Sequence, residues 1–309
     1  MTRTLRRIGL LLGLGATSAA LSASAAQATD AIKWRGWTDS LFADAKRENR
    51  LVILDLEAVW CHWCHVMDET TYADAEVAAL VAKSYLAVKV DQDSRPDLSN
   101  RFEDYGWPAT ILFDSDGREL AKLSGYIPKE RMRILLQAFI DDPTPGPSVT
   151  SERRSPVVLG ESVLSDARRA ELAKDHIENY DFEQGSWGTV HKFLQGDPIE
   201  WTPELALAGD AQAKKMAIQT LNAQLSLVDP VWGGVYQYSH GGVWENPHFE
   251  KIMVVQATNL RIYAMAFAQF QDPKYRAAAV SVRHYLKTFL ASPQGAFFTS
   301  QDADQKQGE

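Results

Sequence analysis

Residues 51–65, LVILDLEAVWCHWCH, join an apolar run of strand length to the only two cysteines of the chain. The run over residues 51–56 is typical of a strand that is covered on both faces. A strand that leads into a Cys-x-x-Cys segment places Cys61 at a helix N-terminus, where free N–H groups and the helix dipole stabilise a thiolate. The sequence therefore predicts that Cys61 is a nucleophile and that Cys64, one turn later, resolves mixed disulfides.

Predicted elements on either side of this segment alternate between helix and strand. Apolar spacing predicts helices over residues 37–48, from the cysteines to about residue 84, and from Pro128 to about residue 140, with a short helix before residue 109. Strands are predicted over residues 86–90, 109–113 and 119–123, with a hairpin turn at Asp114-Ser115-Asp116-Gly117. This order predicts an α/β domain whose mixed sheet is covered by helices on both faces.

Two residues beside the cysteine pair strengthen a redox interpretation. Asp55 lies six positions before Cys61 on the predicted strand, and burial raises the pKa of a carboxyl toward the range where it can exchange protons with a thiol. A strand-end carboxylate that reaches water is the alternative for Asp55. Trp60 directly precedes the first thiol, and we expect it to contribute to substrate binding together with Trp63 and Trp107.

This arrangement resembles the thioredoxin superfamily over about residues 36–141. The resemblance places Trp107-Pro108 in the cis-proline loop that faces the thiols, so that Pro108 shapes the client groove; an ordinary trans proline at the start of a strand is the alternative. A closer resemblance, to the spermatogenesis-associated thioredoxin-like family, is carried by residues 60–67, 88–91 and 95–97. Longer members of that family join a thioredoxin-like domain to an epimerase-like (α/α)6 toroid.

The second half of the chain is predicted to be helical. Residues 142–160 contain four prolines and are predicted to link a domain over residues 29–141 to a helical domain over residues 161–309. Amphipathic spacing predicts helices over residues 203–228, 251–271 and 273–290, separated by loops rich in glycine and aromatic residues. Because Glu309 follows shortly after the third such loop, we expect a partial α/α toroid, either from a truncated member or from one that closes differently.

Two segments of the helical half, residues 247–251 and 300–304, match motifs of the same family. They contain His248, Glu250, Asp302 and Asp304, which we expect in loops where toroids open their pockets. Paired carboxylates there could serve acid/base chemistry on a sugar, and the alternative is helix capping and hydrogen bonding within the loops. Loop aromatics such as Tyr238 could stack on a sugar or fill the core.

The N-terminus has the features of an export signal. Three arginines precede a short apolar run, and small residues lead to Ala28, so residues 1–28 are predicted to be a cleaved signal peptide. We therefore expect a periplasmic or secreted protein without a membrane span after cleavage. Removal of these residues moves the formal charge from −8 to −11, which disfavours nucleic acids and anionic membranes as partners.

Other interpretations of the cysteine pair remain open. Cys61-His62-Trp63-Cys64-His65 satisfies the haem-attachment pattern C-x-x-C-H, and zinc could bind both thiolates with a histidine. We expect neither haem nor zinc, because the preceding strand is not typical of a cytochrome and no second cysteine pair exists. A surface disulfide of no consequence is also disfavoured, since so short a loop adds little stability.

These observations predict an exported thiol-disulfide oxidoreductase without a cofactor other than the redox-active disulfide Cys61–Cys64. Its partners would be protein thiols or disulfides as clients and a redox partner that supplies or accepts electrons. The alternative is a glycan- or peptide-binding helical module attached to a redox-switch or vestigial thioredoxin domain. His62 beside Cys61 suggests a stabilised thiolate and therefore an oxidising pair.

Overall fold

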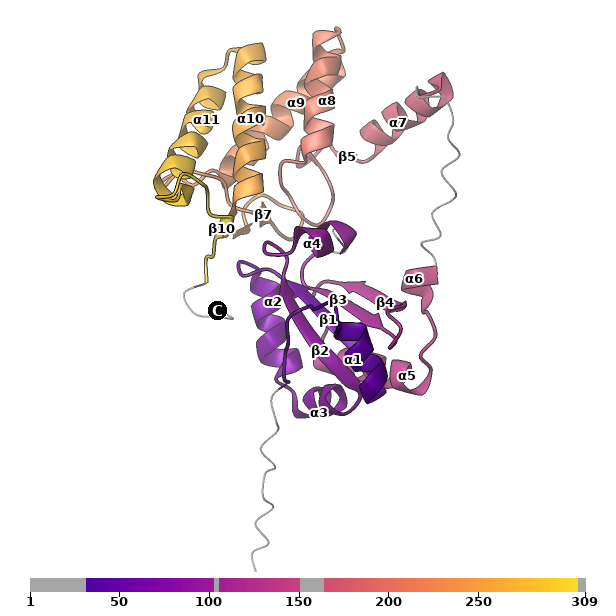
Figure 1. Ribbon diagram of the computed structural model, residues 1–309. Helices are drawn as coiled ribbons and strands as arrows, with labels where there is room; N and C mark the ends of the chain where they lie inside the picture. Colours follow the sequence, from indigo (N-terminus) through magenta and orange to yellow (C-terminus); the bar gives the residue numbers. More distant parts are fainter. Residues whose placement is uncertain (1–31, 103–105, 151–163, 305–309) are drawn as a thin grey trace, which may run out of the picture.

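A computed structural model describes residues 32–102, 106–150 and 164–304. The predicted signal peptide and residues 151–160 of the predicted linker lie outside these described residues. An N-terminal half (residues 32–150) and a helical half (residues 164–304) lie one above the other, with the short strands of the helical half toward the N-terminal half (Figure 1). Among the described residues, no helix has the length and apolar character needed to cross a bilayer.

The sheet of the N-terminal half has four strands in the order β2-β1-β3-β4. These are β1 (Leu51–Glu57), β2 (Tyr85–Asp91), β3 (Ala109–Phe113) and β4 (Glu119–Ser124). β1 pairs with β2 in parallel and with β3 antiparallel, and β3 and β4 form the antiparallel hairpin. The predicted mixed sheet is therefore confirmed, and the LVILDL run is one of its two inner strands.

Helices cover both faces of this sheet, because the strand side chains alternate between two apolar clusters. α1 (Leu41–Glu48) and α4 (Pro96–Phe102) pack against one face, where Val52, Leu54 and Leu56 of β1 lie. α2 (His62–Met67), α3 (Ala75–Ser84) and α5 (Lys129–Asp141) pack against the other face. The thioredoxin-like fold expected from the sequence is thus present, with Cys61 at the end of an inner strand.

The helix predicted from the cysteines to residue 84 is not continuous. A π-helical turn (Asp68–Tyr72) follows α2, and a new helix begins after Asp74, whose carboxylate accepts hydrogen bonds from the N–H groups of Glu76 and Val77. Asp74 is a good N-cap, so it favours a fresh helix start over continuation. α6 (Pro147–Thr150) is likewise a short helix within the predicted linker; it begins with a proline and packs against β4.

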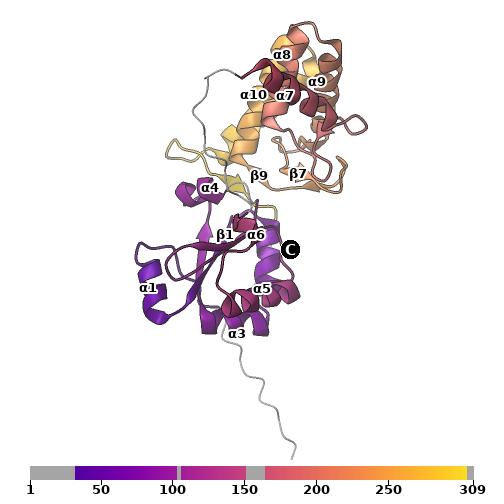
Figure 2. The ribbon, with the colours of Figure 1, turned by 90° about the vertical axis from the view of Figure 1, so that its right-hand side faces the viewer.

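The helical half contains α7 (Asp166–Glu178), α8 (Gly196–Leu207), α9 (Ala211–Gln224), α10 (Met253–Phe270) and α11 (Pro273–Tyr285). The prediction of one helix over residues 203–228 was wrong, because Pro203 lies inside α8 and the chain turns at Gly209, which has a φ of 100°. Asp210 then caps α9. α8 packs against α9 (Figure 2) and α10 against α11 (Figure 1), so the helices form hairpins. A 3-10 turn (Leu225–Leu227) follows α9 and a π-helical turn (Leu286–Leu290) follows α11.

Short strands between the helices support the loops that face the N-terminal half. They form three pairs: β5 (Tyr180–Asp181) with β6 (Ser186–Trp187), β7 (Tyr238–Ser239) with β8 (Pro247–His248), and β9 (Lys251–Ile252) with β10 (Ser300–Gln301).

Two of the glycine-rich loops share the same arrangement of an aspartate paired with a buried lysine. The carboxylates of Asp181 and Asp229 each accept two backbone N–H groups of their own loop. Each carboxylate also binds a buried lysine, Lys192 at 2.7 Å and Lys251 at 2.6 Å, and both lysines donate to a glycine carbonyl. The charge of each lysine is therefore paired within the protein, and these ion pairs connect residues within the loops near the junction of the two halves.

Candidate functional site

Cys61 caps the helix that carries Cys64. The two residues form a disulfide with an S–S distance of 2.04 Å, and the N–H of Cys64 lies 3.1 Å from Sγ of Cys61. Both are buried, with 5% and 2% of their surface exposed. When the bond is reduced, this N–H and the first turn of α2 would stabilise a thiolate at Cys61.

The loop before β3 closes one side of the disulfide. The Trp107–Pro108 peptide bond is cis, in agreement with the prediction, and the Pro108 carbonyl accepts a hydrogen bond of 2.8 Å from Gly125. Trp107 packs against an apolar cluster that contains both cysteines, Ala58, Trp60 and Ile252. Because Ile252 belongs to β9, the helical half contributes directly to the surroundings of the disulfide.

The tryptophans on either side of Cys61 differ in exposure. Trp60 is buried, and its indole N–H donates to Asp93 across 3.1 Å. Trp63 is 42% exposed and packs beside His62 and Tyr126, with ring centroids 5.5 and 5.8 Å away. Trp60 therefore fixes the loop into α2, whereas Trp63 presents an aromatic surface next to the disulfide.

Asp55 is buried beneath α2 and shares one lysine with two other carboxylates. Nζ of Lys89 lies 2.7 Å from carboxylate oxygens of Asp55, Glu57 and Asp68. Burial raises the pKa of Asp55 to about 7, although Lys89 opposes this shift. Burial by itself would lower the pKa of Lys89, but the combined interactions with Asp55, Glu57 and Asp68 outweigh that effect and raise it. Asp55 can thus exchange a proton near neutral pH while Lys89 stays charged.

The position of Asp68 connects this group to the second cysteine. Asp68 follows Cys64 by four residues in one continuous helical segment, so their side chains project from the same face. That face points toward β1 and β2, because Asp68 binds Lys89 there. Asp55 therefore lies on the side of the helix from which Cys64 would gain or lose a proton.

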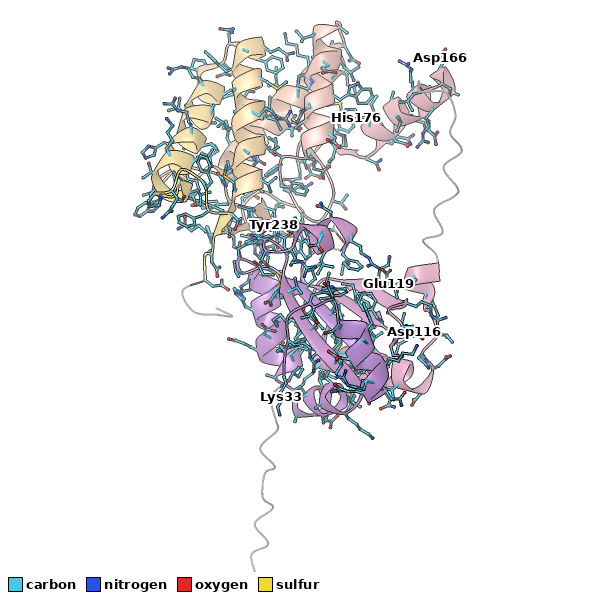
Figure 3. All side chains as sticks on the ribbon, in the orientation of Figure 1. Lys33, Asp116, Glu119, Asp166, His176 and Tyr238 are labelled. Atoms are coloured by element: carbon cyan, nitrogen blue, oxygen red, sulfur yellow. A yellow bond between two sulfur atoms is a disulfide. The ribbon has the colours of Figure 1, made fainter. Side chains whose placement is uncertain are left out.

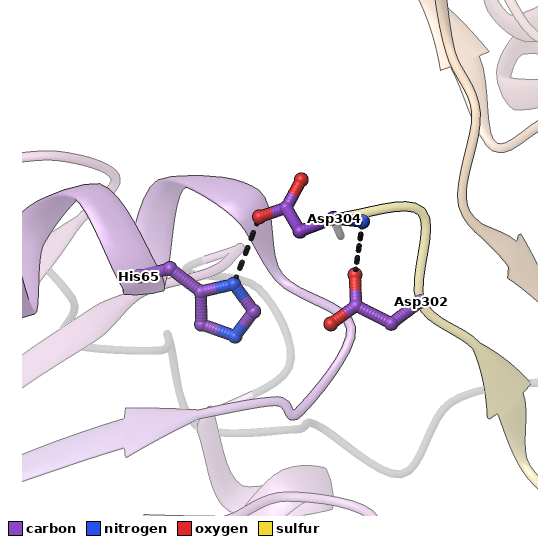
Figure 4. A group of neighbouring side chains, drawn as sticks. All are labelled: His65, Asp302 and Asp304. Carbon is purple, nitrogen blue, oxygen red and sulfur yellow. Dashed lines mark hydrogen bonds and ion pairs between the residues drawn. The ribbon is translucent and has the colours of Figure 1, made fainter. Parts of the chain in front are cut away.

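One of the two helical-half motifs that the sequence singled out, residues 300–304, lies against α2. Asp304 accepts hydrogen bonds from the histidines on either side of Cys64: His65 Nδ1 at 3.0 Å and His62 Nδ1 at 3.3 Å from its carboxylate. Asp302 is exposed and its carboxylate accepts the N–H of Asp304, which shapes the turn (Figure 4). Asp304 therefore fastens the end of the helical half to the redox helix.

Within the described part of the chain, two groups of side chains have the donor atoms and spacing of a metal site. Donor atoms of His65, Asp302 and Asp304 lie within 4.8 Å of one another, as do those of Asp55, Glu57 and Asp68. In the second group the Lys89 ammonium already binds all three carboxylates. In the first group His65 already uses Nδ1 to bind Asp304. Hydrogen bonds and ion pairs thus account for both groups.

The other motif, residues 247–251, lies across a cavity from the disulfide. This cavity has a volume of about 550 Å³ and is lined by both halves, among other residues by Trp60, Cys61, His62, Tyr238, His248 and Glu250. Tyr238 lies at the junction of the two halves, far from His176 and Asp166 (Figure 3). Its ring stacks on His248 at 4.4 Å, and burial together with the Glu250 carboxylate raises the pKa of Tyr238.

Glu250 is the most unusual residue of this cavity. It is 3% exposed, and within the described chain its Oε2 has no hydrogen-bond partner. The closest basic group is His248, whose Nδ1 lies 3.9 Å away. His248, Glu250 and Asp304 therefore face the cysteines, and the two sites that the sequence suggested separately form one composite site.

Three residues at this site were missed by sequence reasoning. Lys89 partners the buried acid, and its place opposite Asp55 in the β1–β2 register could have indicated it. His191 lines the cavity and Ile252 packs on the disulfide, and no motif identifies either one. Other loop aromatics, such as Trp187 and Trp244, are buried and fill the helical core, as the alternative interpretation of the loops predicted.

The N-terminal half is similar in sequence to thioredoxin-like proteins. A family model named Thioredox_DsbH, described as a protein of unknown function (DUF255), matches residues 16–141. The chain is 31% identical to a thioredoxin from Alicyclobacillus acidocaldarius over 99 residues, which are 32% of this chain and 90% of that protein. A solution structure of a thioredoxin from Thermus thermophilus covers 36% of this chain and 88% of its own, with 19% identity and a TM-score of 0.33.

A longer similarity includes the helical half. The chain is 26% identical over 307 residues to spermatogenesis-associated protein 20 from Mus musculus. This match covers 88% of the present chain, which spans 39% of the length of that relative.

Proposed function

This chain belongs to the thioredoxin superfamily through its N-terminal half, and from that premise we propose that it is a thiol-disulfide oxidoreductase. The observation that carries the proposal is the disulfide-bonded pair at the start of α2, opposite a cis Trp107–Pro108 bond. Such a position favours a thiolate at Cys61 and leaves Cys64 to attack the mixed disulfide.

Each residue around the pair has a distinct role in this proposal. Cys61 attacks or is attacked by the substrate sulfur, and Cys64 closes or opens the internal disulfide. Asp55 exchanges the proton of Cys64, since its pKa is raised to about 7. Pro108 and Trp107 shape the wall along which a substrate approaches. The redox-active disulfide is the only cofactor that this scheme requires.

Cellular context is part of the same proposal. An exported protein would act in a compartment where disulfides persist, on thiol- or disulfide-containing clients and with a redox partner of its own. An N-terminal fusion of residues 1–35 to alkaline phosphatase, which is active only after export, tests this part. Activity comparable to that of a known leader is expected, and an inactive fusion that stays in the cytoplasm would contradict export.

Redox titration tests the function. Purified protein equilibrated in glutathione buffers of graded potential, then alkylated and weighed by mass spectrometry, should interconvert between disulfide and dithiol with a two-electron dependence. Cys61→Ser should show no such transition. If the disulfide of the intact protein stays oxidised at every potential down to that of dithiothreitol, the proposal fails.

The alternative of a separate sugar- or peptide-binding module is less well supported. The loop residues on which it rested, His248, Glu250 and Asp304, face the cysteines rather than a pocket of their own. The geometry therefore favours a helical half that completes the redox site.

A further inference from the structure

The substrate class of this redox site follows from what covers the disulfide. Cys61 is 5% exposed, and Ile252 of the helical half packs against the cysteines on one side. Cys61 also lines the cavity between the two halves, whose volume of about 550 Å³ lies in the range of small-molecule sites. Because the helical half covers Cys61 and leaves access through this cavity, a small disulfide reaches Cys61 more readily than a disulfide bond of a folded protein does.

The residues that line the cavity favour a positively charged ligand. Aromatic rings of Trp60, Trp63 and Tyr238 contribute to its walls, and no described residue that lines it is lysine or arginine. Electron-rich aromatic faces attract organic cations. The charge expected of a ligand is therefore positive.

Glu250 gives this preference a specific contact. Its carboxylate is buried on the cavity wall, and the nearest described basic group, His248, lies beyond hydrogen-bond distance at 3.9 Å. Oε2 of that carboxylate is buried without a hydrogen-bond partner among the described residues, which is costly, and a ligand that donates N–H groups would relieve that cost. Burial, together with His248 and His240, lowers the pKa of His191, which favours the neutral form of this cavity residue.

We propose that the cavity binds a low-molecular-weight disulfide that carries an ammonium group, with Glu250 binding the ammonium and Cys61 exchanging with the disulfide. The proposal rests on the oxidoreductase function proposed above. It differs from a general thioredoxin role because the substrate is a small aminothiol compound rather than a protein.

The reaction balances without any other reagent. The Cys61 thiolate bonds to one sulfur of the organic disulfide, whose S–S bond breaks and whose first aminothiol leaves with a proton. The Cys64 thiolate then attacks Sγ of Cys61, restores the internal disulfide and releases the second aminothiol with the second proton. The protein dithiol loses two electrons, and the organic disulfide gains two.

Binding can be tested without redox chemistry. 1,6-Diaminohexane has the shape and charges of cystamine but no sulfur, and 1,6-hexanediol is its neutral counterpart. Calorimetry on the oxidised protein should detect the diamine but not the diol, and Glu250→Gln should weaken diamine binding at least about tenfold. Glu245→Gln, an exposed carboxylate of the same loop region, is the matched control and should bind as the wild type does. Equal affinities of wild type and Glu250→Gln would overturn the proposal.

Exchange kinetics provide the second readout. Reduced protein should react faster with cystamine than with bis(2-hydroxyethyl) disulfide. Each rate is divided by the rate of free dithiothreitol with the same reagent, so that the intrinsic reactivities of the two disulfides cancel. Glu250→Gln should lose this preference, which we expect to be about tenfold or more in the wild type, and an unchanged far-ultraviolet circular dichroism spectrum shows that the variant is folded. A preference unchanged in Glu250→Gln contradicts the substrate class. Diamine binding without exchange of either reagent would instead refute the oxidoreductase function and leave the binding site standing.

Discussion

The carboxylate of Asp304 lies 3.0 Å from Nδ1 of His65, although 239 positions separate the two residues in sequence. His65 directly follows Cys64, and the same carboxylate also reaches His62, directly after Cys61. The helical half is therefore joined to the helix that carries the redox pair, and motion between the halves would change access to the cysteines.

Removal of Asp304 should increase access to Cys61. A hydrogen bond to a charged group contributes about 1.5–3 kcal/mol, so Asp304→Ala should raise the population of opened protein and the alkylation rate of reduced Cys61 by a bulky maleimide about 10- to 150-fold. Stopped-flow alkylation checks this. Glu204→Gln, at an exposed position of α8, should leave the rate unchanged, and an equal rate in Asp304→Ala would show that the contact does not restrict access.

Cys64→Ser should accumulate the intermediate of the exchange reaction. Without the second thiol, the bond between Cys61 and the substrate sulfur cannot be resolved from within the protein. Mass spectrometry after incubation with glutathione disulfide should show one glutathione per chain in Cys64→Ser and none in Cys61→Ser. The reverse pattern would assign the attacking role to Cys64.

Asp55 should make the stability of the protein depend on pH. Burial raises its pKa from 3.8 to about 7, so the folded state binds more protons than the unfolded state between these pH values. The free energy of unfolding should therefore fall as pH rises from about 4 to 7, by up to about 4 kcal/mol from this group. Urea unfolding of Asp55→Asn should lack this decline. The exposed Asp116→Asn should retain it, and parallel curves for wild type and Asp55→Asn would contradict the shift.

The same substitution should change the pH dependence of exchange. A group with a pKa of about 7 beneath the redox helix can take up or supply the proton of Cys64 near neutral pH. Asp55→Asn should slow resolution of the mixed disulfide about 10- to 100-fold at pH 7 and remove the inflection near that pH. Asp68→Asn, which alters another partner of Lys89, should keep the inflection.

Lys89 should be among the residues most needed for stability. Its ammonium is the shared partner of Asp55, Glu57 and Asp68, so Lys89→Met would leave three carboxylates facing one another in a largely buried place. The expected loss is about 3–5 kcal/mol at pH 8 and less at pH 5, where protonation relieves the repulsion. Chemical denaturation measures it. Lys46→Met, which breaks an exposed pair with Asp116, should change stability far less because solvent screens that pair, and equal effects of the two variants would contradict the role of Lys89.

Much of the N-terminal half could be predicted from local sequence. The apolar run before the cysteines can be buried only as an inner strand, and the turn residues at 114–117 join two short β-rich runs. These signals are local, since they depend on residue types within one or two turns of chain. The cis bond at Pro108 was predictable only through the resemblance to the thioredoxin superfamily, because an X-Pro bond permits the cis form without requiring it.

Helix boundaries were less predictable where two signals compete. The pattern over residues 203–228 has continuous helical spacing, yet Gly209 and Asp210 end one helix and begin the next. A glycine with positive φ followed by a good N-cap outweighs the apolar periodicity at that point.

Local residue patterns were enough to predict the chemistry of the cysteine pair: two thiols at redox spacing after a buried strand, with an acid on that strand. The surroundings of the pair depend on the tertiary fold, because the packing of the helical half brings Glu250, Ile252 and Asp304 to cysteines nearly 200 or more positions earlier in the chain. Contacts over such separations depend on how two folded halves meet, and no local pattern of residues encodes that meeting. The placement of residues 247–251 and 300–304 beside the cysteines is accordingly a property of the tertiary fold.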